Sequence, residues 1–146
     1  MELSSRAFEH GERIPPRYTC DGPNVSPPLT IAGVPQGARA LALVMDDPDA
    51  PAGTWDHWVV WNIPPETVEI AEDTEPEGVQ GITDFGVPGY GGPCPPSGTH
   101  RYQFRLYALD RELDLAEGST KDQLETVVKE HVLAEARLTG LYRRQR

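Results

Sequence analysis

Residues 100–109 read HRYQFRLYAL, a stretch that begins with alternating aromatic or apolar and polar side chains. Successive residues of a β-strand point to opposite faces of the sheet, so this alternation predicts a strand with one buried face. The buried face would begin with His100 and continue through Tyr102, Phe104 and Leu106. His100 is therefore expected at the mouth of a buried face.

Two further runs predict strands. Residues 40–45 form a continuous apolar stretch, and residues 57–63 are rich in aromatic and β-branched side chains. If the second strand includes Trp55, alternation places four of its side chains on one side of the sheet: Trp55, His57, Val59 and Trp61. His57 would then begin an apolar stripe, as His100 does.

Proline and glycine punctuate the whole chain. The 15 prolines and 14 glycines are spread along it and divide it into short segments separated by turns. Short strands between frequent turns predict an all-β fold, an antiparallel β-sandwich of the Greek-key type. The length of 146 residues fits a single domain over residues 1–146.

Only one segment has the spacing of a helix. Thr120 and Gln123 are spaced as a capping box, and the residues that follow recur at intervals of three and four: Leu124, Val127, Val128 and His131. Residues 136–142 alternate again and predict a final strand. We therefore expect one C-terminal helix at the edge of the sandwich, followed by a closing strand.

The charge balance excludes several classes of partner. There are 23 acidic and 13 basic residues, and the net charge of -10 repels nucleic acid and anionic membrane surfaces. The N-terminus lacks an apolar signal core, and no stretch is long and apolar enough to span a membrane. We expect a cytoplasmic protein with no nucleic-acid partner and no membrane insertion. An anionic ligand would need a local group of donors.

Three polar clusters lie at strand ends: residues 46–51 (DDPDAP), 55–57 (WDH) and 98–102 (GTHRY). Strand ends gather at the rims of a sandwich, where loops build sites on a rigid frame. Taken singly, each cluster has a structural explanation, because aspartate before proline is a common turn former and a histidine at a strand end is usually structural. Only their joint order favours a site made of Asp47 and the two histidines.

These clusters resemble the signatures of a known family. Residues 47–51, DPDAP, resemble the D-P-D-x-P signature of the phosphatidylethanolamine-binding protein family, and residues 98–101, GTHR, resemble its G-x-H-R signature. His57 stands where that family has its other pocket histidine. The similarity extends over nearly the whole chain, through residues 18–22, 91–96 and 140–142. It is strongest to the short bacterial and archaeal branch often called Raf-kinase-inhibitor-like.

The resemblance implies a rim pocket for phosphate or phosphoryl headgroups, with ligand-binding residues Asp47, Trp55, His57, Pro95, His100 and Tyr102. A carboxylate beside an imidazole fixes its tautomer and favours its protonated form. Residues 91–96 would bring backbone N–H groups close to the anion, because glycine permits tight approach. The expected bracing residues are Asp49, Pro51, Cys94 and Arg101, with Arg101 paired to Asp49 or Asp56.

The chain has two cysteines, Cys20 and Cys94. In a reducing cytoplasm, two isolated thiols are more often free than bridged, so we expect free thiols. The resemblance places Cys94 in the glycine- and proline-rich loop at the pocket rim. If the two cysteines were bridged, they would join two rim loops.

We interpret the protein as an anion-binding protein without a cofactor, for which a regulatory role is one candidate, and not as an enzyme. It lacks H-E-x-x-H, paired C-x-x-C and G-x-S-x-G motifs, and no metal ligands or catalytic residues are assigned. Two alternatives stay open. The resemblance implies that some members inhibit kinases or serine proteases, although no protein target is identified, and a hydrolase could use the Asp-His-His set. The same resemblance favours a homodimer.

Overall fold

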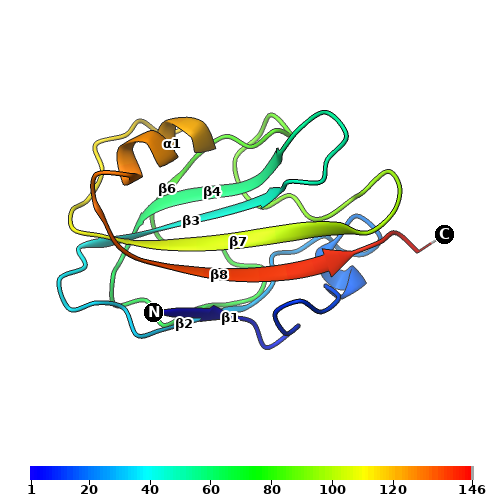
Figure 1. Ribbon diagram of the computed structural model, residues 1–146, viewed down its shortest axis with the longest axis horizontal. Helices are drawn as coiled ribbons and strands as arrows, with labels where there is room; N and C mark the ends of the chain where they lie inside the picture. Colours follow the sequence, from blue (N-terminus) through cyan, green and yellow to red (C-terminus); the bar gives the residue numbers. More distant parts are fainter. Residues whose placement is uncertain (146) are drawn as a thin grey trace.

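Two antiparallel sheets face each other across the main apolar core of the computed structural model, which describes residues 1–145 (Figure 1). The larger sheet has the order β6–β4–β3–β7–β8, and the smaller has the order β1–β2–β5. The strands are β1 (Glu2–Ser4), β2 (Leu29–Ala32), β3 (Ala40–Asp47), β4 (Trp55–Ile63), β5 (Glu69–Ile70), β6 (Val79–Gln80), β7 (His100–Leu109) and β8 (Val132–Tyr142). The predicted all-β architecture is confirmed.

The larger sheet brings strands that are distant in sequence together. Four strands of this sheet follow the Greek-key order, side by side as β7, β3, β4 and β6. In a Greek key the fourth strand returns by a long connection and lies beside the first; here β7 returns to lie beside β3. After β4 the chain crosses to the smaller sheet, where it forms β5, and then returns to the larger sheet as β6. The end of β3 therefore meets both the start of β4 and the start of β7.

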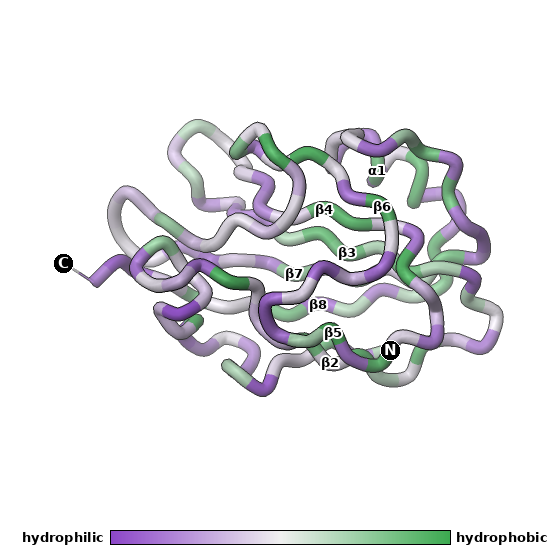
Figure 2. The backbone as a smooth tube through the Cα atoms, turned by 180° about the vertical axis from the view of Figure 1, so that it is seen from behind, coloured by the Kyte–Doolittle hydropathy of each residue, from purple (hydrophilic) through white to green (hydrophobic). Residues whose placement is uncertain are grey.

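Both faces of the larger sheet are covered, which explains why β3 is apolar at every position from Ala40 to Met45. One face packs against the smaller sheet, and its core includes Leu41, Leu43, Trp58 and Phe104. The other face packs against the helix α1 (Lys121–Val128), and its core includes Ala42, Val44, Val59, Trp61, Leu124 and Val128. Figure 2 shows these hydrophobic strands in the interior, with much of the polar sequence in the surrounding loops.

The helix begins as predicted and ends earlier than predicted. The Thr120 side chain accepts a hydrogen bond from the Gln123 backbone N–H, and the Gln123 side chain accepts one from the Thr120 N–H, which completes the capping box. The helix ends at Val128, so the assignment of His131 to its apolar face was wrong. The backbone turns there, and His131 Nδ1 lies 3.0 Å from Asp110 Oδ1 on the surface.

The closing strand is confirmed and is longer than residues 136–142. It begins at Val132 and pairs with β7 along its length, with Tyr142 opposite His100. A short 3-10 helix, η1 (Pro16–Tyr18), precedes the loop that carries Cys20. This loop lies at the same end of the molecule as His100, as described below.

Candidate functional site

A cavity of about 250 Å³ lies at the end of the larger sheet where β3 ends and where β4 and β7 begin. Its lining residues are Asp47, Ala50, Pro51, Trp55, His57, Phe85, Cys94, Pro95, Pro96, His100 and Tyr102. Asp47 is the last residue of β3, and it pairs with Trp55, the first residue of β4. The cavity is thus built on strand ends and closed by loops.

The start of β4 departs from simple alternation. The register between β3 and β4 shifts so that Met45 pairs with Trp58 while Asp46 pairs with Asp56, which leaves His57 as an extra residue. Such a bulge reverses the parity of the strand. His57 therefore lines the cavity, whereas Val59 and Trp61 pack in the core under α1. The predicted single stripe from Trp55 to Trp61 was wrong for this reason.

Alternation along β7 was predicted correctly. His100 and Tyr102 line the cavity, while Phe104 and Leu106 continue into the core on the same face. His100 Nδ1 lies 2.6 Å from Asp47 Oδ2, and both side chains are buried, with 9% and 5% of their surface exposed. The carboxylate accepts from Nδ1, which leaves Nε2 as the nitrogen available to a ligand.

His57 is held differently from His100. Its Nδ1 lies 2.6 Å from the Gly91 carbonyl oxygen, and since a carbonyl only accepts, Nδ1 carries the proton. Burial lowers the pKa of His57, so the ring favours its neutral form, and Nε2 is then an acceptor. Tyr102 and Phe85 pack edge to face with this imidazole, with ring centroids 5.3 and 5.2 Å away. The two histidines of the cavity thus have different hydrogen-bonding roles.

The Tyr102 hydroxyl adds a donor. It is buried, and within residues 1–145 no hydrogen bond of normal geometry reaches it, although Asp47 and the Cys94 backbone lie close to it. Burial raises the pKa of Tyr102, and the nearby charge of Asp47 raises it further, so the hydroxyl keeps its proton. A ligand in the cavity would find this group available.

The turn after β3 is braced by two aspartates. Asp47 Oδ1 accepts a hydrogen bond from the Asp49 N–H at 2.8 Å, which closes an Asx-type turn. Asp49 in turn pairs with Arg101 through two guanidinium nitrogens, at 2.8 and 2.9 Å. These hydrogen bonds lower the pKa of Asp49 to about 2. Of the two acids expected for Arg101, Asp49 is the one used, because Asp56 pairs with Lys121.

The glycine- and proline-rich loop serves a structural purpose at its start. The Gly91 N–H donates to the His57 carbonyl, and the Gly92 N–H donates to Asn24 Oδ1 at 2.9 Å. These two amides are therefore engaged within the protein, and the expectation that they face an anion was wrong. A Cβ on Gly92 would lie 2.3 Å from the Tyr18 carbonyl oxygen, so the close approach of the two loops requires glycine.

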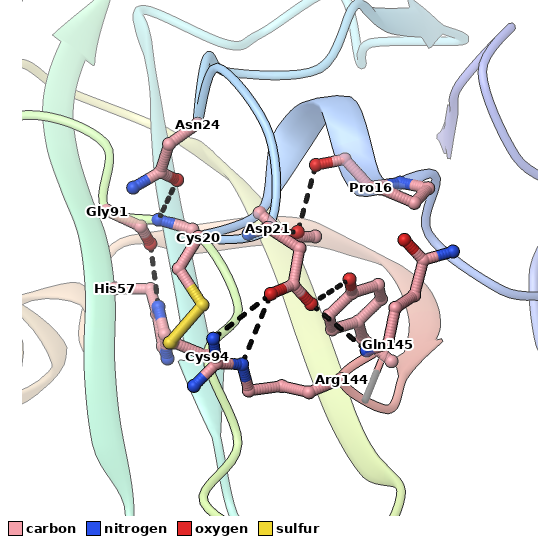
Figure 3. The surroundings of a disulfide bond; sticks show 12 residues. Pro16, Cys20, Asp21, Asn24, His57, Gly91, Cys94, Arg144 and Gln145 are labelled. Carbon is pink, nitrogen blue, oxygen red and sulfur yellow. Dashed lines mark hydrogen bonds and ion pairs between the residues drawn. A yellow bond between two sulfur atoms is a disulfide. The ribbon is translucent and has the colours of Figure 1, made fainter.

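The expectation of free thiols was also wrong. Cys20 and Cys94 form a disulfide with a Cα–Cα distance of 5.4 Å (Figure 3). The chain brings the two loops together through the Cys20 N–H, which donates to the Pro93 carbonyl oxygen at 3.1 Å. The bridge joins the loop after η1 to a wall of the cavity, as expected for the bridged alternative.

The cavity brings together nearly all of the residues predicted from the sequence. All six expected ligand-binding residues line it, as do Pro51 and Cys94, while Asp49 and Arg101 lie beside it as a pair. Sequence reasoning missed Ala50, Pro96 and Phe85. Ala50 and Pro96 adjoin predicted residues, but Phe85 is a single aromatic in a segment without strand or helix pattern, and no local signal pointed to it.

Within residues 1–145, no group of three or more His, Cys, Asp or Glu side chains is arranged to hold a metal ion. None of the helices in this part of the chain has the length and hydropathy needed to cross a membrane.

Comparisons with known proteins agree with the fold and with the sequence signatures. The family model described as "Phosphatidylethanolamine-binding protein" matches residues 4–143. A UPF0098 protein of Methanothermobacter thermautotrophicus is 55% identical over 150 residues, which cover 99% of each chain. A UPF0098 protein of Aquifex aeolicus is 49% identical, over 99% of this chain and 89% of its own. None of these names describes an enzyme.

Two solved structures share the whole fold. The crystal structure of a phosphatidylethanolamine-binding protein homologue from Chlamydia trachomatis has a TM-score of 0.96 and 42% identity, covering 99% of this chain and 97% of that one. The crystal structure of YbcL of Escherichia coli, described as a member of the mammalian PEBP family, has a TM-score of 0.91 and 34% identity, covering 99% and 98%.

Proposed function

The chain belongs to the phosphatidylethanolamine-binding protein family, and on this premise we propose that it binds a phosphate-type anion or a phosphoryl headgroup in the cavity described above. The observation that carries this proposal is the convergence of Asp47, His57 and His100 on one cavity of about 250 Å³. The name of the family supports a ligand with a phosphoryl group. A regulatory role for such binding is part of the same proposal.

The hydrogen-bonding groups of the cavity match a phosphate that keeps one proton. Paired with Asp47, the imidazolium form of His100 would donate its Nε2–H to a phosphate oxygen, and the Tyr102 hydroxyl would donate to another. Neutral His57 would accept the remaining P–O–H hydrogen through Nε2. Sulfate offers no such hydrogen at neutral pH, so phosphate should bind more tightly than sulfate.

The rest of the cavity favours an organic ligand over a bare ion. Most of the lining is apolar or aromatic, and Trp55 and Phe85 remain 38% and 44% exposed at its edge. Their rings pack edge to face with centroids 5.6 Å apart. A phosphate ester would cover this apolar surface and gain burial free energy that inorganic phosphate lacks. Phosphorylethanolamine is thus a better probe than phosphate, provided that it is titrated near pH 6, where about half of a phosphate monoester keeps its P–O–H hydrogen.

The test is calorimetric titration with phosphorylethanolamine, phosphate and sulfate. His100→Ala should weaken binding of the phosphorylated probes roughly 10- to 100-fold, the cost of one charge-assisted hydrogen bond. His131→Ala is the matched control, because His131 also pairs with an aspartate but lies far from the cavity lining. Equal affinities of the wild type and the His100 variant would refute the proposal.

A second candidate is a protein-interaction module, for which the same exposed aromatics are the supporting observation. Trp55 and Phe85 at the cavity edge suit a partner side chain as well as a ligand. A hydrolase ranks third: Ser97 lines a separate hollow together with Arg143 and Arg144, so a hydrolase would have to activate water through a histidine. Turnover of an activated phosphate or carboxylate ester that is lost with His57→Ala would favour this third reading.

We also propose that the protein is cytoplasmic and forms a homodimer. The disulfide requires an oxidising compartment or a bond that resists cytoplasmic reductants. Thiol trapping in freshly lysed cells would separate these two cases, and light scattering during gel filtration would give the oligomeric state.

A further inference from the structure

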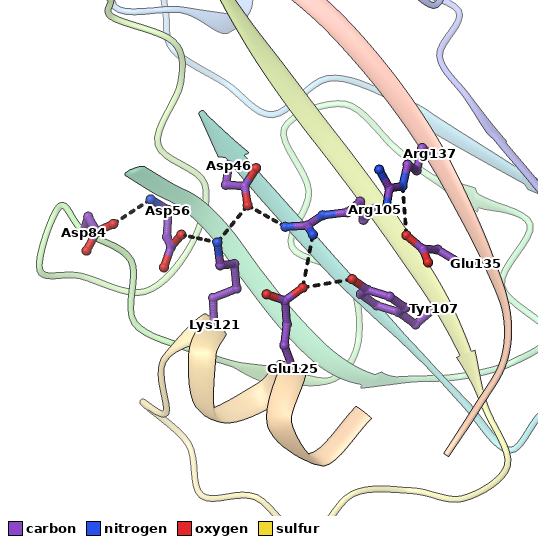
Figure 4. Close-up of polar contacts among 9 residues, drawn as sticks. All are labelled: Asp46, Asp56, Asp84, Arg105, Tyr107, Lys121, Glu125, Glu135 and Arg137. Atoms are coloured by element: carbon purple, nitrogen blue, oxygen red, sulfur yellow. Dashed lines mark hydrogen bonds and ion pairs between the residues drawn. The ribbon is translucent and has the colours of Figure 1, made fainter. Parts of the chain in front are cut away.

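A partly buried ion network lies on the face of the larger sheet that α1 covers (Figure 4). Its centre is Lys121, the first residue of α1, which is only 6% exposed. Lys121 Nζ lies 2.8 Å from Asp46 Oδ2 and 2.9 Å from Asp56 Oδ1. Asp46 also pairs with Arg105, which reaches Glu125 of α1. The network therefore joins the helix to three strands of the sheet, β3, β4 and β7.

The two aspartates face each other across β3 and β4, where the strands enter the cavity. Asp46 and Asp56 are register partners at the bulge. Like charges directly opposite each other on paired strands are destabilising, and burial strengthens the effect. Lys121 is placed between them and removes the repulsion. Burial lowers the pKa of Lys121, but the hydrogen bonds to both carboxylates outweigh burial and raise it, so the amino group stays charged.

Each aspartate adjoins residues of the cavity. Asp46 precedes Asp47 in the sequence, and Asp56 lies between Trp55 and His57. Asp47, Trp55 and His57 line the cavity, whereas the two aspartates of the network do not. Because neighbouring residues of a strand point to opposite faces, a charge that fixes Asp46 and Asp56 on one face also fixes their neighbours on the other. The bulge at His57 makes this point of the sheet dependent on such support, since an extra residue weakens the ladder.

Asp56 also anchors the loop that carries Phe85. The Asp56 N–H donates to Asp84 Oδ2 at 2.6 Å, and the Asp84 N–H donates to the Asp56 carbonyl oxygen at 3.0 Å. Phe85 follows directly and packs on the His57 ring. Displacement of Asp56 would thus move both His57 and the aromatic that covers it.

We propose that Lys121 is a positioning residue for the cavity: its charge holds Asp46 and Asp56 together across β3 and β4, and so sets the placement of Asp47, His57 and Phe85. Lys121 touches no cavity-lining residue through its own charged group and acts only through the two aspartates. The proposal rests on the proposed anion site for its binding consequence. The placement of the histidine rings can be observed without any ligand.

The experiment compares Lys121→Met with two controls. Lys129→Met removes the same charge from the other lysine of the chain, which is exposed just after α1. Val128→Ala weakens the packing of α1 on the sheet without touching the ion network. The measurements are the NMR signals of the His57 and His100 rings in the ligand-free protein, and the affinity for phosphorylethanolamine by calorimetry.

We expect Lys121→Met to displace the ring signals of His57 and to weaken binding by about tenfold, the lower end of the effect of residues that orient ligands of a site. Both controls should keep the wild-type signals. Lys121→Met combined with Asp56→Asn should recover the signals, because Arg105 already neutralises Asp46. If Lys121→Met alone does not fold, a folded double variant with wild-type ring signals supports the proposal, and displaced signals in it overturn it.

Unchanged ring signals in Lys121→Met would overturn the proposal, as would an equal displacement in Val128→Ala. The ring signals also separate this proposal from the proposed function. If the wild type binds none of the probes, the anion site is refuted, while displaced His57 signals in Lys121→Met alone still support the positioning role.

Discussion

Removing the disulfide should cost the protein a large part of its stability. Cys20 and Cys94 are separated by 74 positions, so the bridge closes a loop of about 75 residues in the unfolded chain. The chain-entropy relation for such a loop gives about 15 cal/mol/K, or about 4.5 kcal/mol at 25 °C. Domains of this size are stable by roughly 5–15 kcal/mol. We therefore expect Cys20→Ser with Cys94→Ser to lose about 4 kcal/mol.

Urea denaturation measures this loss directly. With a slope of roughly 2 kcal/mol/M, the midpoint of the double variant should lie about 2 M below that of the oxidised wild type. Reductant should move the wild type to the midpoint of the variant and leave the variant unchanged. A difference below about 0.5 M between the oxidised wild type and the variant would refute the reasoning, as would two titratable thiols in the unreduced, denatured protein.

Loss of the disulfide should change the ligand affinity of the cavity much less than it changes the free energy of unfolding. Three hydrogen bonds hold the same loops together without the sulfur atoms. They are Cys20 N–H to the Pro93 carbonyl at 3.1 Å, Gly92 N–H to Asn24 Oδ1 at 2.9 Å, and the Tyr90 hydroxyl to the Tyr18 carbonyl at 2.7 Å. The bridge acts mainly on the unfolded chain. Affinity for phosphorylethanolamine in the folded variant should therefore fall only a few-fold.

Three further perturbations test other parts of the structure. The pKa of Asp49 is lowered to about 2 by Arg101, so the stability that this pair contributes is present above about pH 4 and is lost as the pH falls toward 2. The loss should be less than about 1 kcal/mol because the pair is partly exposed, and it should be absent in Asp49→Asn. Burial lowers the pKa of His57, so its ring should titrate below the ordinary value of about 6.5 in NMR, and the stability that it contributes should be complete above that pH and decline below it. A Cβ on Gly140 would lie 2.4 Å from Ile14, so Gly140→Ala should destabilise by about 1–3 kcal/mol in thermal unfolding, whereas Gly37→Ala, whose nearest atom is 3.9 Å away, should change stability by less than about 0.5 kcal/mol.

The sequence was sufficient for features that depend on local periodicity. Alternation in residues 100–106 placed His100 and Tyr102 on one face, and the structure has them there. The spacing of Thr120 and Gln123 placed the start of the helix. In both cases, neighbouring residues determine the outcome, so a short window contains the information that is needed.

Features that depend on distant partners could not be predicted in this way. The bulge at His57 is defined by the register against β3, and the same letters without a bulge would put His57 on the face of Val59. The disulfide depends on a 5.4 Å approach of two loops that are far apart in sequence. Likewise, nothing near Lys121 in the sequence marks Asp46 and Asp56 as its partners.

The protein has a net charge of -10, and the cations named below, which lie near the cavity, are already paired with acidic side chains. This pairing determines which forces could hold an anion there. Arg101 is paired with Asp49, Arg144 with Asp21, and Lys121 with Asp46 and Asp56. Because these cations are already compensated, attraction of a ligand would come from directed hydrogen bonds in a buried site, where ions screen weakly. Affinity for phosphorylethanolamine should then change only about two- to threefold between 50 and 500 mM NaCl, after correction for ligand activity. A steep loss with salt, such as proteins that neutralise phosphates with free lysines and arginines show, would mean that unpaired cations hold the ligand and that the histidine pair is secondary.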